Sequence, residues 1–206
     1  MFKNNIKTLT SLSNRYLTGT SSVTALNIND SSQIQTPTLT NPANILFISL
    51  FRSLQEFPNT NNSTNASSLK ILGPNPIKGN ISALVSDPST LIGKISIIQL
   101  NYTDWNIATI GYSQPYSIMP VSTAWQDVKS QNSYAKLVYI APKGSDPLFS
   151  LQEVKVSTFD VQNISLAYYD DTNSQKYIQP IYVFNGVATL SNGILADFYF
   201  YVPAIQ

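Results

Sequence analysis

The chain has 206 residues, 43% of them hydrophobic, and a chain of this length can bury a substantial core. Its 12 basic and 11 acidic residues leave a formal net charge of +1, and no cluster of basic residues offers the positive face that nucleic acids require. Because the sequence has neither histidine nor cysteine, it excludes a neutral-pH histidine switch, thiol catalysis, Ser-His triads and the common zinc sites.

Residues 1–68 are dense in Ser, Thr, Asn and Gln and are predicted to form a separate N-terminal region with one or two helices. The first helix is predicted from apolar residues near helical spacing, namely Ile6, Leu9, Leu12 and Tyr16. A short strand is expected over residues 23–28, where apolar and polar side chains alternate.

A second helix is indicated after Asn41, which suits an N-cap, and Pro42, which suits the first helical turn. In such a helix the larger apolar side chains share one face: Phe47, Leu50, Phe51 and Leu54. The alternative is a buried strand from Ile45 to Phe51, because so short an apolar run fits either structure. Pro58 ends the element in both cases, and residues 59–68 are expected to form an exposed loop.

From residue 69 onward, strand patterns dominate, and residues 69–206 are predicted to form an antiparallel β-rich domain. The expected strands cover residues 69–74, 81–85, 92–102, 107–112, 135–141, 152–160, 164–169, 177–190 and 194–202. One helix is expected from an N-cap at Ser122 to about Lys129. Asn192-Gly193 between two alternating apolar runs predicts a hairpin turn. The predicted fold class is therefore α+β, an antiparallel sheet with a few short helices on one face.

The C-terminal blocks Tyr177-Ile-Gln-Pro-Ile-Tyr-Val-Phe-Asn-Gly186 and Tyr201-Val-Pro-Ala-Ile205 carry a family resemblance. With the segments 116–125 and 161–169, they resemble the ending of YycI-like and PepSY-associated domains, over about residues 69–206. The resemblance implies a membrane-anchored domain that lies outside the membrane, regulates or binds other proteins and has no assigned catalytic residues. Because the first residues lack the apolar stretch of a signal peptide, the anchor or signal is expected to lie outside this sequence.

The same C-terminal block predicts an interaction surface. Pro180 cannot donate to a sheet ladder, so it is expected at an edge or a bulge, and Gly186 is expected to mark a second bulge. In the run 198–201, the two Phe side chains should face the core and the two Tyr side chains the other side. The candidate contact residues are Tyr177, Gln179, Pro180, Tyr182, Tyr199 and Tyr201. Ordinary packing within the sheet is the competing interpretation of these aromatic side chains.

Candidate catalytic and metal-binding groups have simpler explanations. Ser67 to Lys70 and Ser133 to Lys136 match Ser-x-x-Lys, but the Ser-Asp-Asn and Lys-Thr-Gly partners of penicillin-binding proteins are missing. Asp170 and Asp171 fit turn chemistry better than a calcium loop. Acids lie close to both tryptophans, Asp104 beside Trp105 and Asp127 near Trp125, where they are more often surface groups than a sugar-cleaving pair. We therefore expect no catalytic residues, no cofactor and no resident metal.

Asn-x-Ser/Thr triplets predict N-glycosylation sites if the chain reaches a glycosylating compartment. They begin at Asn29, Asn61, Asn62, Asn65, Asn80, Asn101 and Asn163. Chance occurrence in a sequence so rich in Asn, Ser and Thr is an equal explanation.

The sequence as a whole predicts a non-enzymatic, extracytoplasmic domain at the cell surface. It would bind another protein, or copies of itself, through a sheet edge or a tyrosine-rich face, and would bind no nucleic acid. One alternative is a structural subunit of an envelope layer, a filament or a virion. Another is an acid-active hydrolase that uses carboxylates, whose candidate residues are Asp104, Asp127, Asp160 and Asp197.

Overall fold

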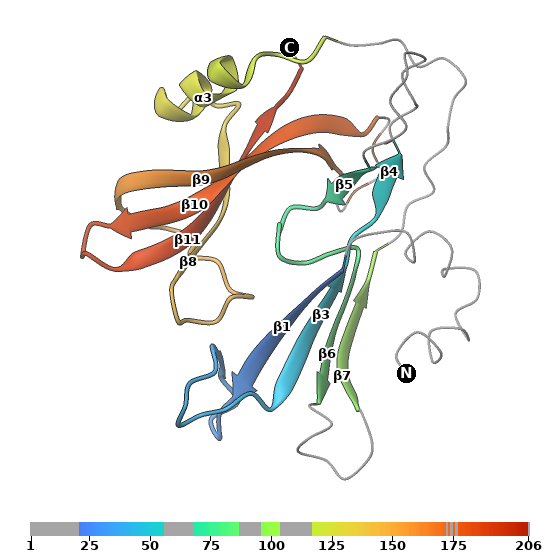
Figure 1. Ribbon diagram of the computed structural model, residues 1–206, viewed down its shortest axis with the longest axis vertical. Coiled ribbons are helices and arrows are strands. Elements are labelled where there is room, and N and C mark those ends of the chain that lie inside the picture. Colours follow the sequence, from blue (N-terminus) through green and yellow to red (C-terminus); the bar gives the residue numbers. More distant parts are fainter. Residues whose placement is uncertain are drawn as a thin grey trace.

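The computed structural model describes residues 21–55, 68–86, 96–103, 117–171, 173, 175 and 177–205, which form two β-sheets (Figure 1). The smaller sheet is antiparallel throughout and has the strand order β2-β1-β3-β6-β7. Its strands are β1 (Ser21–Ile28), β2 (Ile34–Gln35), β3 (Ile45–Leu50), β6 (Ile81–Ser86) and β7 (Ile97–Tyr102).

The larger sheet is a mixed half-barrel with the order β4-β5-β9-β10-β11-β8. Its strands are β4 (Ser53–Gln55), β5 (Ser68–Leu72), β8 (Lys136–Pro142), β9 (Val156–Tyr169), β10 (Gln179–Leu190) and β11 (Leu195–Pro203). Only β5 and β9 pair in parallel. The short helix α3 (Val121–Lys129) packs on one face of this sheet, so the predicted β-rich α+β class is confirmed.

Apolar side chains on both faces stabilise the larger sheet. On the helix side, Phe184 and Phe198 are fully buried and pack with Ala124 and Val128 of α3. The ring of Trp125 lies 5.6 Å from that of Phe184, so the helix is fixed by its apolar stripe. The opposite face buries a second cluster, Phe51, Leu72, Ala167, Ile181, Val183 and Tyr201.

The chain passes directly from the smaller to the larger sheet at Phe51 and Arg52, between β3 and β4. Phe51 is buried among side chains of the larger sheet, although it follows a strand of the smaller one. Ser49 is fully buried; its hydroxyl donates to the carbonyl of Ile77 (3.0 Å) and accepts from the N–H of Gly79 (2.5 Å). These contacts fix the segment after β5 against the smaller sheet.

The inner face of the smaller sheet points toward this junction. Leu26, Ile45, Phe47 and Leu84 form its buried cluster, and side chains from two connecting segments, Ile77 and Leu148, pack against them. Thr36 adds a hydrogen bond from its hydroxyl to the carbonyl of Ser145 (3.2 Å). The segment after β8 therefore contacts the smaller sheet.

The C-terminal hairpin is confirmed. Gly193 adopts φ +82° in the turn between β10 and β11, a conformation that glycine takes without steric cost. The bulge predicted at Gly186 is also confirmed, because the β9–β10 register shifts between Asn185 and Gly186. A Cβ built on Gly186 would overlap the carbonyl of Asp160, so only glycine fits there. This bulge allows β9 to continue as one strand through residues 156–169, where two strands were predicted.

The helix predicted after Asn41 is wrong, and the alternative strand is correct. Ile45, Phe47 and Ser49 alternate with less buried neighbours, and β3 pairs with β1 on one side and β6 on the other. Hydrogen bonds to two flanking strands satisfy the backbone and override the weak helical pattern.

Two further local predictions are wrong. The N-cap of α3 is Pro120, with no side-chain hydrogen bond, and not Ser122, which lies inside the helix. Pro180 lies neither at a sheet edge nor at a register shift, because β10 runs between β9 and β11. As the second residue of its strand, it contributes its carbonyl, which accepts the N–H of Ala204 (2.9 Å).

Several predicted elements fall outside the described residues: the helix built on Ile6 to Tyr16, most of the loop 59–68, and the strand 107–112. Of the expected strand 92–102, the described part contains β7 from Ile97. Strands on both sides of residue 68 pair with one another, β3 with β6 and β4 with β5. The division expected at residue 68 therefore coincides with no boundary between the sheets.

Replacing Gly186 with alanine should lower the free energy of unfolding by about 3 kcal/mol, because the new methyl group meets backbone atoms of β9. Chemical denaturation would measure this loss. Gly73→Ala is the control: its Cβ would meet only the carbonyl of Asp170, at 3.7 Å, and should change stability little. Equal losses in the two variants would contradict the bulge as the cause.

Candidate functional site

The tyrosines of the predicted interaction surface do not form one surface. Tyr182 is buried on the helix side of the larger sheet and donates its hydroxyl to the carbonyl of Met119 (2.8 Å). Tyr201 is buried on the opposite face and donates to the carbonyl of Gly73 (3.1 Å). Tyr177, by contrast, is 69% exposed. The two buried rings therefore serve packing.

The remaining members of that set lie at intermediate depth. Gln179 and Pro180 begin β10, and Tyr199 lies on β11 with its ring 5.7 Å from that of Tyr139. Tyr139 is itself buried and donates to the carbonyl of Pro147 (2.8 Å). The tyrosine-rich side of the C-terminal hairpin is therefore largely covered by its own neighbours.

Burial changes the acid–base chemistry of these rings. It raises the pKa of Tyr139, Tyr199 and Tyr201 above the ordinary value, because the phenolate would lose its hydration. The carboxylate of Asp197 adds to the rise in pKa for Tyr139 and Tyr199. All three side chains therefore stay neutral near physiological pH.

The candidate carboxylates have separate surface partners. Asp127 accepts a hydrogen bond from Asn132 (3.1 Å), and Asp197 lies 3.7 Å from the Lys143 ammonium. Asp160 and Asp197 both lie opposite Val187 of β10, so two strand spacings, about 10 Å, separate them. Both are exposed on an open sheet face.

Asp104 lies outside the described residues, and within the described part no group of acidic residues is suited to hold a metal ion. Both Ser-x-x-Lys lysines are exposed: Lys70 lies 5.2 Å over the ring of Phe51, and Lys136 is on edge strand β8. Asp170 is buried at the end of β9, and its N–H bonds to the carbonyl of Leu72 (2.9 Å). These placements fit structural roles.

Four of the candidate glycosylation sites are described. The side-chain oxygen of Asn29 accepts hydrogen bonds from the backbone N–H groups of Ser31 and Gln33. The side-chain oxygen of Asn80 accepts one from the backbone N–H of Arg52. Asn163 is exposed on β9 and donates to Asn185 (3.2 Å), and Asn101 is exposed on β7. Asn61, Asn62 and Asn65 lie outside the described residues.

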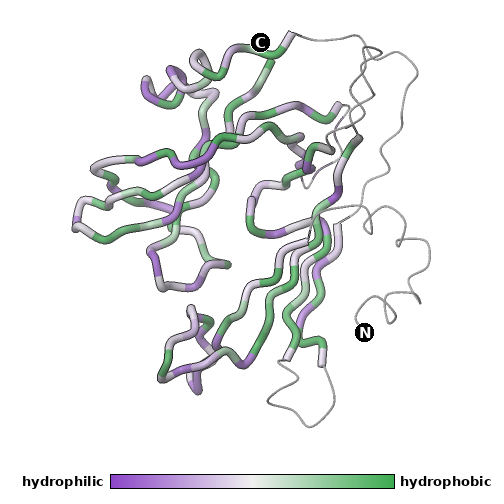
Figure 2. Tube along the Cα trace, viewed as in Figure 1, coloured by the Kyte–Doolittle hydropathy of each residue, from purple (hydrophilic) through white to green (hydrophobic). Residues whose placement is uncertain are grey.

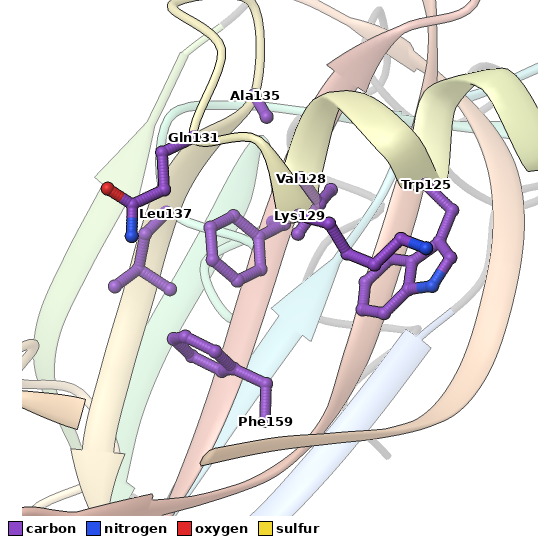
Figure 3. Close-up of a pocket in the computed structure, with 8 residues that line it drawn as sticks. Trp125, Val128, Lys129, Gln131, Ala135, Leu137 and Phe159 are labelled. Carbon is purple, nitrogen blue, oxygen red and sulfur yellow. The ribbon is translucent and has the colours of Figure 1, made fainter. Parts of the chain in front are cut away.

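A cleft of about 460 Å³ opens beneath α3 (Figure 3). Its lining is mostly apolar, with the Lys129 ammonium and the Gln131 amide as the polar groups. Its residues are Trp125, Val128, Lys129, Gln131, Ala135, Leu137, Phe159 and Phe200. The lining contains no carboxylate or hydroxyl group, and Lys129 is its one charged residue.

The smaller sheet presents the most distinctive surface. The face opposite its buried cluster, here called the outer face, carries apolar side chains on all four main strands by the register of the pairs. Figure 2 shows that these strands are rich in hydrophobic residues. The register assigns to it Ser21, Val23, Ala25, Leu46, Ile48, Leu50, Ile81, Ala83, Val85, Ile97, Ile98, Leu100 and Tyr102. Ala83 and Val85, in the middle of this face, are buried, and the side chains nearer its edges are more exposed. Antiparallel sheets of soluble proteins usually place polar side chains on the face that is not packed on the core.

Exposure on the outer face is high on the two outermost of the four main strands, β1 and β7. Ile97, Ile98 and Leu100 are 58%, 54% and 51% exposed, and Val23 on β1 is 61% exposed. A register shift between Leu84 and Val85 brings Ile97 and Ile98 to the same side. The strand therefore carries its apolar residues on the outer face.

Strand β7 is also an edge. Within the described residues its only paired neighbour is β6. Its sequence, Ile-Ile-Gln-Leu-Asn-Tyr, contains no charge and no proline, two of the features that commonly block edge strands from pairing with other chains. A third such feature, a bulge, is present near its start, at the register shift opposite Leu84 and Val85. Sequence reasoning identified the β-branched stretch but not this site, because the identity of the edge strand depends on long-range pairing.

Comparison with protein-family models, with curated proteins and with solved structures found no match. Among the described residues, no helix has the length and apolar character required to span a membrane. The resemblance to YycI-like domains stays a prediction.

Stability should be nearly constant from pH 5 to 8, because the chain has no histidine, and should fall above about pH 10. Above that pH the tyrosines ionise in the unfolded chain, while the raised pKa of Tyr201 keeps its folded form neutral. Each tyrosine that is ionised in the unfolded chain but still neutral in the folded protein lowers the free energy of unfolding by about 1.4 kcal/mol for every pH unit above about pH 10.

Tyr201→Phe should reduce this alkaline slope while costing about 1 kcal/mol at pH 7, because the hydrogen bond to Gly73 is lost. Urea unfolding at a series of pH values measures both effects. An alkaline slope unchanged in this variant would contradict the assignment to Tyr201.

Proposed function

We propose that this protein is a non-enzymatic, extracytoplasmic binding or regulatory domain that contacts a partner protein through β7 and the adjoining outer face. The observation that carries the proposal is the exposed apolar row on β7, at an uncharged sheet edge. Apolar surface of this kind on a soluble domain commonly marks an interaction site.

The chemistry of the edge suits an extended segment of the partner. An added strand would bond to backbone groups of β7, and the apolar side chains on the outer face would supply pockets for alternate side chains. Ile98 and Leu100, 54% and 51% exposed, offer such positions two residues apart. The amide-rich, nearly uncharged composition and the resemblance to YycI-like domains support the extracytoplasmic location.

A photocrosslinking amino acid at Ile98 tests the proposal, with one at Leu195 as the control. Leu195 is also half exposed, at 49%, but lies on β11 of the larger sheet. In the native surface fraction, the probe at Ile98 should crosslink to a defined protein. An excess of wild-type protein without the probe should compete and abolish this crosslink, whereas an excess of the Leu100→Lys variant should not. Identical products from both positions, or equal displacement by Leu100→Lys, would contradict the proposed surface.

A structural subunit of an envelope layer, a filament or a virion is the second candidate, because an open edge also permits serial assembly. Electron microscopy at rising protein concentration separates the two functions. Ordered arrays would favour the subunit, and particles of defined small size would favour the binding domain.

A further inference from the structure

We infer that the cleft beneath α3 binds a small amphipathic anion, a carboxylate on an apolar body of about ten carbon atoms. Lys129 would hold the carboxylate, and the aromatic lining would hold the apolar body. The cleft lies on the helix side of the larger sheet, so this inference does not depend on the surface proposed on β7.

The cleft offers apolar surface that the described fold leaves uncovered. Its volume, about 460 Å³, falls within the range of about 300–1,000 Å³ that small-molecule pockets occupy. The ring of Phe159 packs edge-on against those of Phe198 and Phe200, with centroid distances of 4.9 and 5.0 Å, and yet is 36% exposed. Leu137, which also lines the cleft, is 37% exposed (Figure 3). A ligand with an apolar body would remove this surface from water.

The charge of the cleft selects an anion. Lys129 is exposed at the end of α3, and among the described residues no carboxylate pairs with its ammonium group. Two acids are adjacent in sequence to lining residues, and each has a partner of its own. Asp127 accepts from Asn132 (3.1 Å). Asp160 accepts from Gln162 (3.3 Å). Aromatic clefts often bind cations, but here the ammonium group would repel one.

The turn that ends α3 places a second polar group in the lining. Asn132 donates its N–H to the carbonyl of Asp127 (3.0 Å). Gln131 donates to the carbonyl of Val128 (3.2 Å), which completes the two bonds of a Schellman turn. Gln131 has φ +53° at the position where such turns usually carry glycine, and its side chain lines the cleft (Figure 3). A residue held in such a strained conformation is typical of a binding site.

Isothermal titration calorimetry of the full chain with decanoate is the first test, and decyltrimethylammonium is the control with the same tail and a positive head. Decanoate should bind once per chain with a dissociation constant of roughly 0.1 mM, the strength expected for about a dozen non-hydrogen atoms. Added salt should weaken its binding, and the cationic probe should bind at least about tenfold less tightly. The absence of saturable decanoate binding, or equal binding of the two probes, would overturn the inference.

Two variants that each remove one positive charge test the role of Lys129. Lys129→Gln should weaken decanoate binding by about three- to fivefold, because the ion pair is lost. Lys78→Gln removes the same charge from an exposed lysine between β5 and β6, and should leave decanoate binding unchanged. Equal losses in the two variants would indicate general attraction to the charge of the protein and would overturn the assignment.

Leu137→Glu and Leu100→Glu locate the site. The first variant places a carboxylate in the cleft lining, and the second places one on β7. Both leucines are exposed, 37% and 51%, so both variants should fold. Only Leu137→Glu should abolish decanoate binding, because it would confine two carboxylates together. Loss of binding in Leu100→Glu alone would place the ligand on the outer face and overturn the inference.

Gln131→Gly separates binding from folding. Glycine relieves the strained φ, so the melting temperature should be unchanged or higher. Decanoate binding should nevertheless weaken by about threefold, because one wall of the cleft is lost. A lower melting temperature together with full decanoate binding would show that Gln131 serves only the turn, and would overturn its place in the site.

Discussion

The crossing of the chain at Phe51 and Arg52 is the constraint on which the arrangement of the two sheets depends. Phe51 is buried in the larger sheet, one residue after the end of β3 in the smaller sheet. Ile77 and Leu148, from segments that follow strands of the larger sheet, pack on the inner face of the smaller sheet, so that face turns toward the larger sheet. Ser49 and Leu148 complete that contact. The outer face and the β7 edge are therefore the surfaces of the smaller sheet directed away from the junction.

This arrangement assigns different roles to the two sheets. The larger sheet buries apolar side chains on both faces, and its tyrosine hydroxyls are satisfied by backbone carbonyls. Its exposed edge strand, β8, begins with Lys136 and ends with Pro142, residue types that discourage pairing with other chains. The smaller sheet has no such residues on β7. The larger sheet thus buries apolar side chains on both faces, whereas the smaller sheet leaves apolar side chains exposed on β7.

Local sequence patterns predicted much of the fold because local physics determines those parts. The Asn192-Gly193 turn and most strands of the C-terminal half depend on conformations and side-chain patterns that neighbouring residues set. Gly186 indicated a bulge from its residue type alone, although the close approach of Asp160 on β9 is what requires glycine there. The element at residues 45–50 could not be decided from its own sequence, because its hydrogen bonds are made with β1 and β6. Pro180 shows the same limit. It was expected at an edge or a bulge, yet β10 pairs with β9 on one side and β11 on the other, which places Pro180 inside the sheet and away from either register shift.

The candidate site was the least predictable part, since an edge strand is identified only when the order of all the strands is known. The sequence pattern of Tyr182 and Tyr201 suited a recognition surface, but in the fold both rings are buried and serve packing.

Hydrogen exchange resolved to single residues is the most direct test of β7 as an open edge that binds a partner, with Asn101 as an internal reference. Thr103 bonds to Asn80 of the segment before β6, so the N–H of Asn101, two residues earlier, also points toward β6 and should be protected throughout. The N–H of Leu100 points away from β6, so it should exchange rapidly in the isolated protein and become protected when a partner binds. Rapid exchange at Leu100 that does not change with added partner would contradict the account.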